Sequence, residues 1–202
     1  MNIPNIILAS ASAYRKEILG NYHLDTEQIC PQVDETVLPF EKPRTRARRL
    51  GRNKAESIFQ QISGRNRWLI LASDQVCHMD GTIYHKPGST EIASDHLRAF
   101  SGKWVTFSTS LVLLDHRGQR FETVEDYRLH YRKLSSHEIK DYLRSEQPFD
   151  CAGAIKIESY GLSLIKNTAG RDINSVYGLP IIAVFEGLRA MNYSLFHIKK
   201  NI

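Results

Sequence analysis

Unbroken apolar runs and amphipathic segments alternate along the first third of the chain. Residues 6–9 and 68–72 are short and wholly apolar, which is typical of strands buried on both faces. A further strand is expected within 24–31. Between 44 and 58, apolar residues recur at helical spacing and predict an amphipathic helix. This mixture of buried strands and amphipathic helices predicts an α/β protein (mixed α+β).

The second half predicts a long antiparallel strand pair and three capped helices. β-branched and aromatic residues fill 104–114, and a turn at 115–118 leads to a second strand that reaches Tyr131. The first of these helices is expected to start at Ser89 or Thr90 and to be closed by Ser101-Gly102. The second is expected to start at the capping box of Ser135 and Glu138. The last is expected to follow Pro180 and to end at Met191. Because no linker or repeat interrupts these elements, we expect residues 1–202 to form a single domain.

Residues 71–87 place two residues suited to chemistry on either side of a predicted hairpin. Asp74 follows the buried run 68–72, and Asp80-Gly81 favours a tight turn between two short strands, after which comes Lys86. A carboxylate at a strand end suits a metal or a water, and a lysine one hairpin later suits a phosphate. An ordinary surface Asp and Lys explain the same residues equally well.

The first strand runs into a serine-rich turn that opens a helix. The N-terminus of a helix offers unpaired backbone N–H groups and a partial positive charge, and Ser10, Ser12 and Arg15 add donors to them. This turn is therefore a candidate anion site. The alternative is that Ser12 only caps the helix.

The basic run 42–54 divides into two kinds of cation. Arg44, Arg48 and Arg52 fall on one face of the predicted helix and are interpreted as solvated. Lys54 falls on the apolar side of the helix, where a cation needs a buried partner such as a phosphate. Lys54 is therefore the stronger candidate for a site.

Two adjacent acids, Asp34 and Glu35, precede this helix in a polar loop. Such residues are usually solvated. They become candidate metal ligands if they face Asp74, because Mg²⁺ prefers a few carboxylates together with phosphate oxygens and waters. The histidines offer no comparable site, since His78 and His85 lack a third ligand at metal spacing.

Composition limits the class of protein. Hydrophobic residues make up 42% and charged residues 24% of the chain, as in ordinary globular proteins. No apolar stretch is long enough to cross a membrane and the N-terminus has no signal-peptide pattern, so we expect a cytoplasmic protein. The formal charge of +5 favours an anionic partner, which a nucleotide, a nucleic acid or an acidic protein would satisfy equally.

Cys30, Cys77 and Cys151 contain no CxxC pair and are predicted to be reduced and structural.

Taken together, these motifs resemble the Maf-like nucleoside triphosphate pyrophosphatases over nearly the whole chain. The matching blocks are LASASAYRKEIL at 8–19, VDE at 33–35, Lys54-Ala55, SDQV with KP at 73–87, Ser101-Gly102, PFDCAGAIKIE at 148–158 and VYGLP at 176–180. The resemblance implies a Maf/Ham1-like fold, an elongated mixed sheet flanked by helices, with two lobes around a deep cleft. It also implies hydrolysis of a nucleoside triphosphate to the monophosphate and diphosphate with a divalent metal, Mg²⁺ or Mn²⁺. A homodimer is plausible for the family.

The same resemblance assigns roles to six residues. Asp74 is expected to be the proton acceptor and, with Glu35, a ligand of the metal. The remaining four are expected to bind the triphosphate, and they are Ser10, Arg15, Lys54 and Lys86. These assignments make chemical sense, because attack of water at the α-phosphorus requires a base, a metal and cations that neutralise the phosphates.

Three further positions separate the branches of the family by base, and here they are Tyr14, Gln75 and Glu158. With these residues the chain is similar to the branch that hydrolyses 7-methyl-GTP. N7-methylation puts a positive charge on guanine, which favours stacking on an aromatic face, and a carboxylate accepts the N–H donors of the guanine edge. That branch typically has Pro-Trp where this chain has Ala13-Tyr14, and tyrosine is the weaker cation–π partner.

Two alternatives stay open at this point. The same chemistry could act on dTTP, UTP or another modified nucleotide. A protein of a different class, a non-catalytic regulator that binds nucleic acid through the arginine-rich helix, predicts binding that depends steeply on salt and survives loss of Asp74. The resemblance favours a small nucleotide as the partner, with no nucleic acid and no membrane.

Overall fold

The computed structural model describes residues 3–62 and 64–196. Within them an eight-stranded mixed sheet has the order β2-β1-β3-β6-β4-β5, with β7 beside β6 and β8 beside β7. The strands are β1 (Asn5–Ala9), β2 (Thr26–Ile29), β3 (Trp68–Ala72), β4 (Gln75–Met79), β5 (Thr82–Tyr84), β6 (Trp104–Asp115), β7 (Arg120–Tyr131) and β8 (Ile165–Ala169). The helices are α1 (Ala13–Asn21), α2 (Pro43–Gln61), α3 (Thr90–Phe100), α4 (Ser136–Glu146) and α5 (Ile181–Ala190), with three short 3₁₀ turns at 152–154, 160–164 and 173–175.

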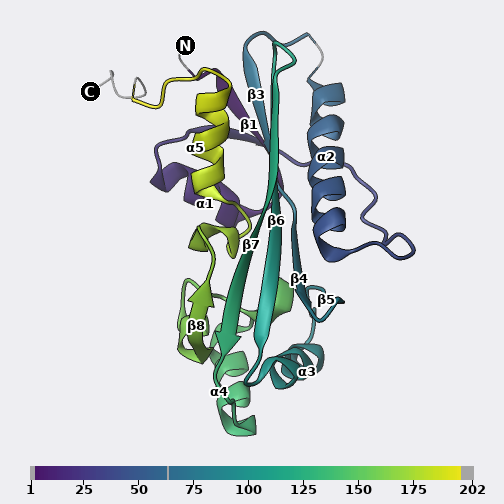
Figure 1. Cartoon of the computed structure of the whole chain (residues 1–202), viewed down its shortest axis with the longest axis vertical. Coiled ribbons are helices and arrows are strands. Elements are labelled where there is room, and N and C mark those ends of the chain that lie inside the picture. The colour runs from purple at the N-terminus through teal and green to yellow at the C-terminus, as the bar shows by residue number, and fades with distance from the viewer. Residues whose placement is uncertain (1–2, 63, 197–202) are drawn as a thin grey trace.

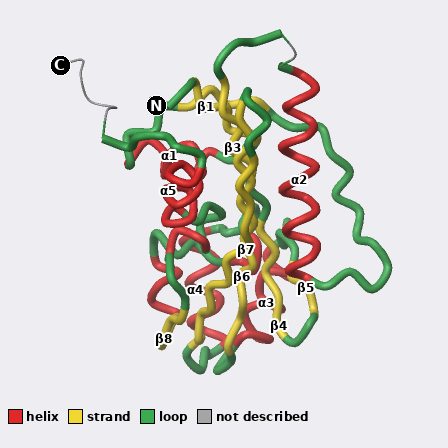
Figure 2. The backbone as a smooth tube through the Cα atoms, turned by 45° about the horizontal axis from the view of Figure 1, so that its top comes forward, coloured by secondary structure: helices red, strands yellow, loops and turns green. Residues whose placement is uncertain are grey.

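One lobe is built on the parallel strands β2, β1 and β3, and β6 runs antiparallel to β3. Helix α2 covers one face of this part of the sheet, whereas α1 and α5 cover the other, as Figures 1 and 2 show. The central strand β3 packs on both sides, since it is buried at all five positions. This is the physical reason that its sequence is a continuous apolar run.

The second lobe is built around the far end of the β6–β7 hairpin. The two strands pair from Trp104 opposite His130 to Leu114 opposite Arg120, and they run the length of the molecule in Figure 1. The hairpin β4–β5, helices α3 and α4, and strand β8 gather at this end. A large core that includes Phe100, Phe107 and Tyr131 fills the lobe.

The predicted elements are largely confirmed. Ser12, Ser89 and Ser135 cap their helices, and the capping box with Glu138 is complete. The tight turn at Asp80-Gly81 has positive φ at both residues, which this hairpin type requires.

Several elements differ from the prediction in their extent or were not predicted. The strand expected within 24–31 is only four residues long. Strand β8 had no sequence signal, because four of its five residues are exposed and only its pairing with β7 defines it.

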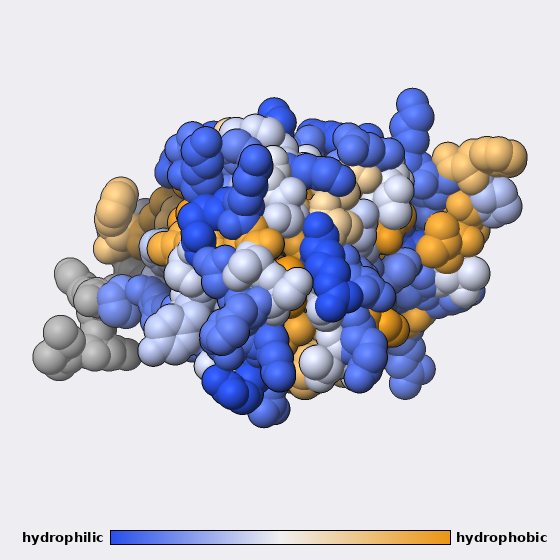
Figure 3. Space-filling model, turned by 90° about the horizontal axis from the view of Figure 1, so that it is seen from below, coloured by the Kyte–Doolittle hydropathy of each residue, from blue (hydrophilic) through white to orange (hydrophobic). Residues whose placement is uncertain are grey.

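The end of the molecule that carries α3 and α4 has a mainly hydrophilic surface. Figure 3, a view of the end that carries α3 and α4, shows polar residues over most of the surface with smaller apolar patches between them. Among the described residues, no helix has the length and apolar character needed to cross a membrane.

Candidate active site

A cleft of about 700 Å³ opens beside the carboxyl ends of β1 and β3. Its walls come from the turn before α1, the inner face of α2, the β4–β5 hairpin and the segments 150–158 and 176–178. All nine residues to which the resemblance assigned a role line it, and they are Ser10, Tyr14, Arg15, Glu35, Lys54, Asp74, Gln75, Lys86 and Glu158. The structure therefore brings together residues from six separate stretches of the chain.

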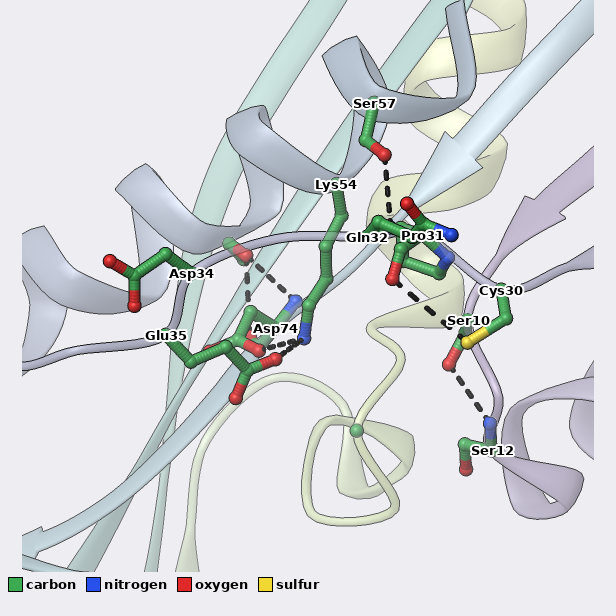
Figure 4. A network of polar contacts seen from close by, with 12 residues as sticks. Ser10, Ser12, Cys30, Pro31, Gln32, Asp34, Glu35, Lys54, Ser57 and Asp74 are labelled. Carbon is green, nitrogen blue, oxygen red and sulfur yellow. Dashed lines mark hydrogen bonds and ion pairs between the residues drawn. The ribbon is translucent and has the colours of Figure 1, made fainter. Parts of the chain in front are cut away.

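Lys54 lies at the centre of the polar network. Its Nζ is 2.5 Å from Oδ1 of Asp74 and 2.8 Å from Oε1 of Glu35, and Figure 4 shows both carboxylates turned toward it. Asp74 is 6% exposed and Lys54 9% exposed. The prediction that Lys54 needs a buried partner is thus confirmed, although the partners in the structure are two carboxylates.

These two carboxylates differ in their protonation behaviour. Burial raises the pKa of Asp74, and the positive charges of Lys54 and Arg15 offset this only in part. Burial also raises the pKa of Glu35, but the hydrogen bond and charge of Lys54 outweigh it and leave that pKa below its ordinary value. Glu35 is therefore the stable anion, and Asp74 is the group that takes up a proton more readily.

The loop that carries Glu35 is held by arginines of α2. Arg46 donates to the backbone oxygen of Glu35 at 2.6 Å, and Arg49 donates to that of Thr36 at 3.0 Å. Arg49 also makes a two-pronged contact with the carboxylate of Glu41 at 2.6 and 2.8 Å. Of the two adjacent acids, Asp34 turns away and accepts hydrogen bonds from Thr36, so Glu35 alone of this pair faces Lys54.

The outer arginines of the same helix contact the protein itself. Arg44 pairs with Asp126 at 2.7 Å, and Arg52 pairs with Glu122. Both acids lie on β7. The arginine-rich face is exposed as predicted, but two of its three members are already neutralised.

The serine-rich turn caps α1, which is one of the two functions considered for it, and anion binding there stays a prediction. Ser12 caps α1, accepting from the N–H of Arg15 at 3.4 Å. The hydroxyl of Ser10 accepts from the N–H of Ser12 at 3.1 Å and from Arg15 at 3.0 Å. Arg15 Nε also donates to the backbone oxygen of Gly178 at 2.8 Å. Gly178 has φ +94°, and a Cβ there would lie 3.0 Å from Arg15 Nε, so this approach depends on glycine.

The opposite end of the cleft is less charged and contains aromatic residues. Burial and the neighbouring acidic groups of Cys151 and Asp150 raise the pKa of Tyr14 to about 12, so its ring stays neutral. Glu158 is exposed at the surface of this end, and partial desolvation raises its pKa. Tyr177 also lines the cleft here.

Gln75 faces a loop rather than open space. Its amide nitrogen donates to the backbone oxygens of Ser175 at 2.6 Å and Val176 at 2.8 Å. A longer contact of 3.3 Å joins it to the hydroxyl of Thr109. The donor end of this side chain is thus already engaged with the protein.

The sequence reasoning missed two residues of the cleft, Arg46 and Tyr177. Arg46 lies eight residues before Lys54 with Leu50 midway, and this spacing of four could have placed it on the same helix face. Tyr177 belongs to the VYGLP block, which carried the resemblance but was given no role. Cys30, Cys77 and Cys151 are free thiols, as predicted, and they also line the cleft.

The described part of the chain holds no group of three or more His, Cys, Asp and Glu residues arranged to bind a metal. Glu35 and Asp74, which both contact Lys54, form a set of two carboxylates. Such a set suits a hard divalent cation whose other ligands are phosphate oxygens and waters, as Mg²⁺ prefers.

Three comparisons place the chain among known proteins. A family model described as Maf-like protein matches residues 5–191. A 7-methyl-GTP pyrophosphatase of Idiomarina loihiensis is 40% identical over 190 residues, which cover 94% of this chain and 95% of that protein. A nucleoside triphosphatase (dITP/XTP pyrophosphatase) crystal structure from Mycobacterium abscessus matches with a TM-score of 0.40 and 13% identity, covering 64% of this chain and 75% of that one.

Proposed function

Because the chain belongs to the Maf-like protein family, we propose that it hydrolyses 7-methyl-GTP to 7-methyl-GMP and diphosphate. The observation that carries the proposal is the contact of Lys54 with Glu35 and Asp74 in a cleft whose other end holds Tyr14 and Glu158. This arrangement provides groups for the triphosphate and groups for a cationic base in one continuous space.

The phosphate end supplies the parts that the reaction requires. A water attacks the α-phosphorus, the bond from that phosphorus to the bridging oxygen breaks, and diphosphate leaves. Asp74 takes the proton of the water, a role that its raised pKa suits. Arg15, Lys54 and Lys86 line the same cleft and balance the negative charge of the triphosphate.

A divalent cation fits the two-carboxylate set described above. When bound, it supplies charge neutralisation on the phosphate oxygens. Glu35 and Asp74 would hold it. Arg46 and Arg49 support this function by fixing the loop on which Glu35 lies.

The base end suits a purine with a positive charge. The neutral ring of Tyr14 offers an electron-rich face, and the carboxylate of Glu158 accepts N–H donors of the guanine edge. A non-catalytic nucleic-acid regulator is the weaker hypothesis, because Arg44 and Arg52 are paired with acids of β7.

The test is release of diphosphate from 7-methyl-GTP, GTP, UTP, dTTP and CTP with Mg²⁺ or Mn²⁺. We expect 7-methyl-GTP to be hydrolysed fastest and Asp74→Asn to lose about a thousandfold or more in kcat, as expected for loss of a base. Glu35→Gln is expected to be severely impaired. Asp34→Asn is the matched control, since this neighbouring acid points away from Lys54, and it should retain wild-type activity.

Two outcomes would contradict the proposal. Faster hydrolysis of UTP or dTTP than of 7-methyl-GTP would leave the proposed reaction in place but would contradict the assignment of 7-methylguanine as the preferred base. Absence of hydrolysis with every nucleotide, together with salt-dependent binding of RNA or DNA, would favour the regulator. The homodimer and the cytoplasmic location stay predictions, and light scattering of the purified chain tests the first.

A further inference from the structure

The segments that carry Tyr14 and Tyr177 lie side by side. Arg15, next to Tyr14, donates from Nε to the backbone oxygen of Gly178, next to Tyr177, at 2.8 Å. Ser73 donates to the same oxygen at 2.7 Å. The cleft thus has a wall in which two aromatic side chains, separated by 163 positions in the sequence, come from segments that the Arg15 side chain joins by its hydrogen bond to the Gly178 backbone.

Tyr177 is anchored by its surroundings. It is half-buried and packs against both the core of the second lobe and the core between α1, α5 and the sheet. Burial, with the negative charge of Glu158, raises the pKa of its phenol, which places the hydroxyl in the electrostatic field of that carboxylate. Glu158 therefore influences both Tyr14 and Tyr177.

Gln75 fixes the loop immediately before Tyr177. Its amide nitrogen donates to the carbonyls of residues 175 and 176, and Thr109 donates to the carbonyl of Ser175 at 2.7 Å. The N–H groups of this amide are consumed by these contacts. Gln75 can therefore act on the base through the position of the Tyr177 loop.

We propose that Tyr177 is a second aromatic wall of the base site, that with Tyr14 and Glu158 it selects a positively charged purine, and that Gln75 is its positioning residue. This inference rests on the proposed function and assigns the selection to residues of this chain. Two tyrosine faces and a carboxylate together provide the attraction that a lone tyrosine would provide weakly. Tyr14, which is a weaker cation–π partner than a tryptophan, is thus complemented by Tyr177 from a distant segment of the chain.

The first experiment measures binding of 7-methyl-GMP and GMP by calorimetry, which does not depend on hydrolysis or on a metal. Tyr177→Leu is expected to reduce the preference for the methylated nucleotide about tenfold, and Tyr177→Phe, which keeps the ring, should retain it. Tyr160→Leu is the matched control, because Tyr160 is exposed and lies outside the cleft lining. A wild-type preference in Tyr177→Leu would overturn the inference.

The second experiment tests the role of Gln75 with a double-mutant cycle. Gln75→Met removes the donor while keeping the length of the side chain. If Gln75 acts through Tyr177, the double variant Gln75→Met/Tyr177→Leu discriminates as poorly as Tyr177→Leu alone, whereas direct contact of Gln75 with the base gives additive losses. Additive losses of discrimination in the double variant would overturn the positioning role. A second cycle with Tyr177→Phe, which keeps the ring, covers the case in which Tyr177→Leu folds poorly: Gln75→Met/Tyr177→Phe should discriminate between the two nucleotides as Gln75→Met alone does.

Failure of the inference is distinguishable from failure of the proposed function. Equal binding of 7-methyl-GMP and GMP by the wild-type protein would contradict the proposed substrate itself, and with it the inference. A clear wild-type preference that survives in Tyr177→Leu would leave the substrate in place and overturn only the role of Tyr177.

Discussion

At the scale of single residues, Lys54 balances two carboxylates that would otherwise repel each other. Asp74 is buried, and its carboxylate and that of Glu35 both contact the Nζ of Lys54. Removing one member of a buried charge cluster leaves the others without compensation, which costs more than the cluster itself contributes. The stability of the site and the phosphate binding proposed for it therefore depend on the same side chain.

This arrangement predicts a non-additive effect on stability. Lys54→Met should lower the free energy of unfolding by about 3 kcal/mol, because it removes the cation in direct contact with the buried carboxylate of Asp74. In Lys54→Met/Asp74→Asn the uncompensated charge is absent, so the double variant should be more stable than Lys54→Met. Denaturant titration of the metal-free protein measures both values. A double variant that is less stable than Lys54→Met would contradict this account of the site.

Residue identities could be predicted from the sequence, but several of their contacts could not. Lys54 was recognisable because a cation on an apolar helix face is unusual. The contacts of Gln75 with residues 175 and 176, and of Arg15 with Gly178, join positions that lie 100 or more residues apart. No local pattern encodes such pairs. They follow only once the strands are assembled.

At the scale of elements, capping residues were the most reliable signals of where helices begin. The capping box at the start of α4 also makes a contribution to stability that depends on pH. Glu138 accepts from the N–H of Ser135 at 2.9 Å and from Arg132 at 3.0 Å. Hydrogen bonds from the Ser135 backbone, then from the Arg132 and Ser135 side chains, lower the pKa of Glu138 from 4.5 to about 2. Local geometry alone determines this motif, so the sequence predicts it well.

The lowered pKa of Glu138 predicts the pH range over which the capping box stops stabilising the folded protein. A carboxyl whose pKa is lower in the folded state stabilises that state above the unfolded pKa, and the contribution is lost as the pH falls through the folded value. Wild-type protein should therefore be more stable than Glu138→Gln at pH 7, and the difference should narrow between pH 4.5 and about 2. Thermal unfolding across this range checks it. A difference that does not change with pH would mean that the charge of Glu138 contributes nothing.

Elements that depend on distant partners were harder to predict. Strand β8 is an exposed edge whose identity comes from its pairing with β7. Helix α2 approaches β6 so closely that a Cβ on Gly51 would lie 2.4 Å from the hydroxyl of Ser110. The apolar spacing of α2 predicted a helix and its buried face, but the need for glycine at 51 arises only from the position of β6.

At the scale of the whole molecule, β6 joins the hydrophobic cores. Val105 and Phe107 belong to the core of the second lobe, Leu111 and Leu113 to the core under α1 and α5, and Val112 to the core under α2. A strand that is buried in all three cannot detach from one of them without disturbing the others. The two lobes are therefore joined by a continuous element.

This continuity predicts that the two lobes unfold together. The chain has two tryptophans, Trp68 on β3 and Trp104 at the far end of β6, so each lobe has its own reporter. In Trp104→Phe and Trp68→Phe, fluorescence should give denaturant midpoints that each coincide with the loss of helical circular dichroism measured on the same variant. Leu97→Ala in one core and Leu188→Ala in another should each cost about 2–5 kcal/mol and should shift the curves of both reporters equally. If Leu97→Ala moved only the Trp104 curve, the lobes would be independent folding units, and the shared hairpin would connect them without coupling their stability.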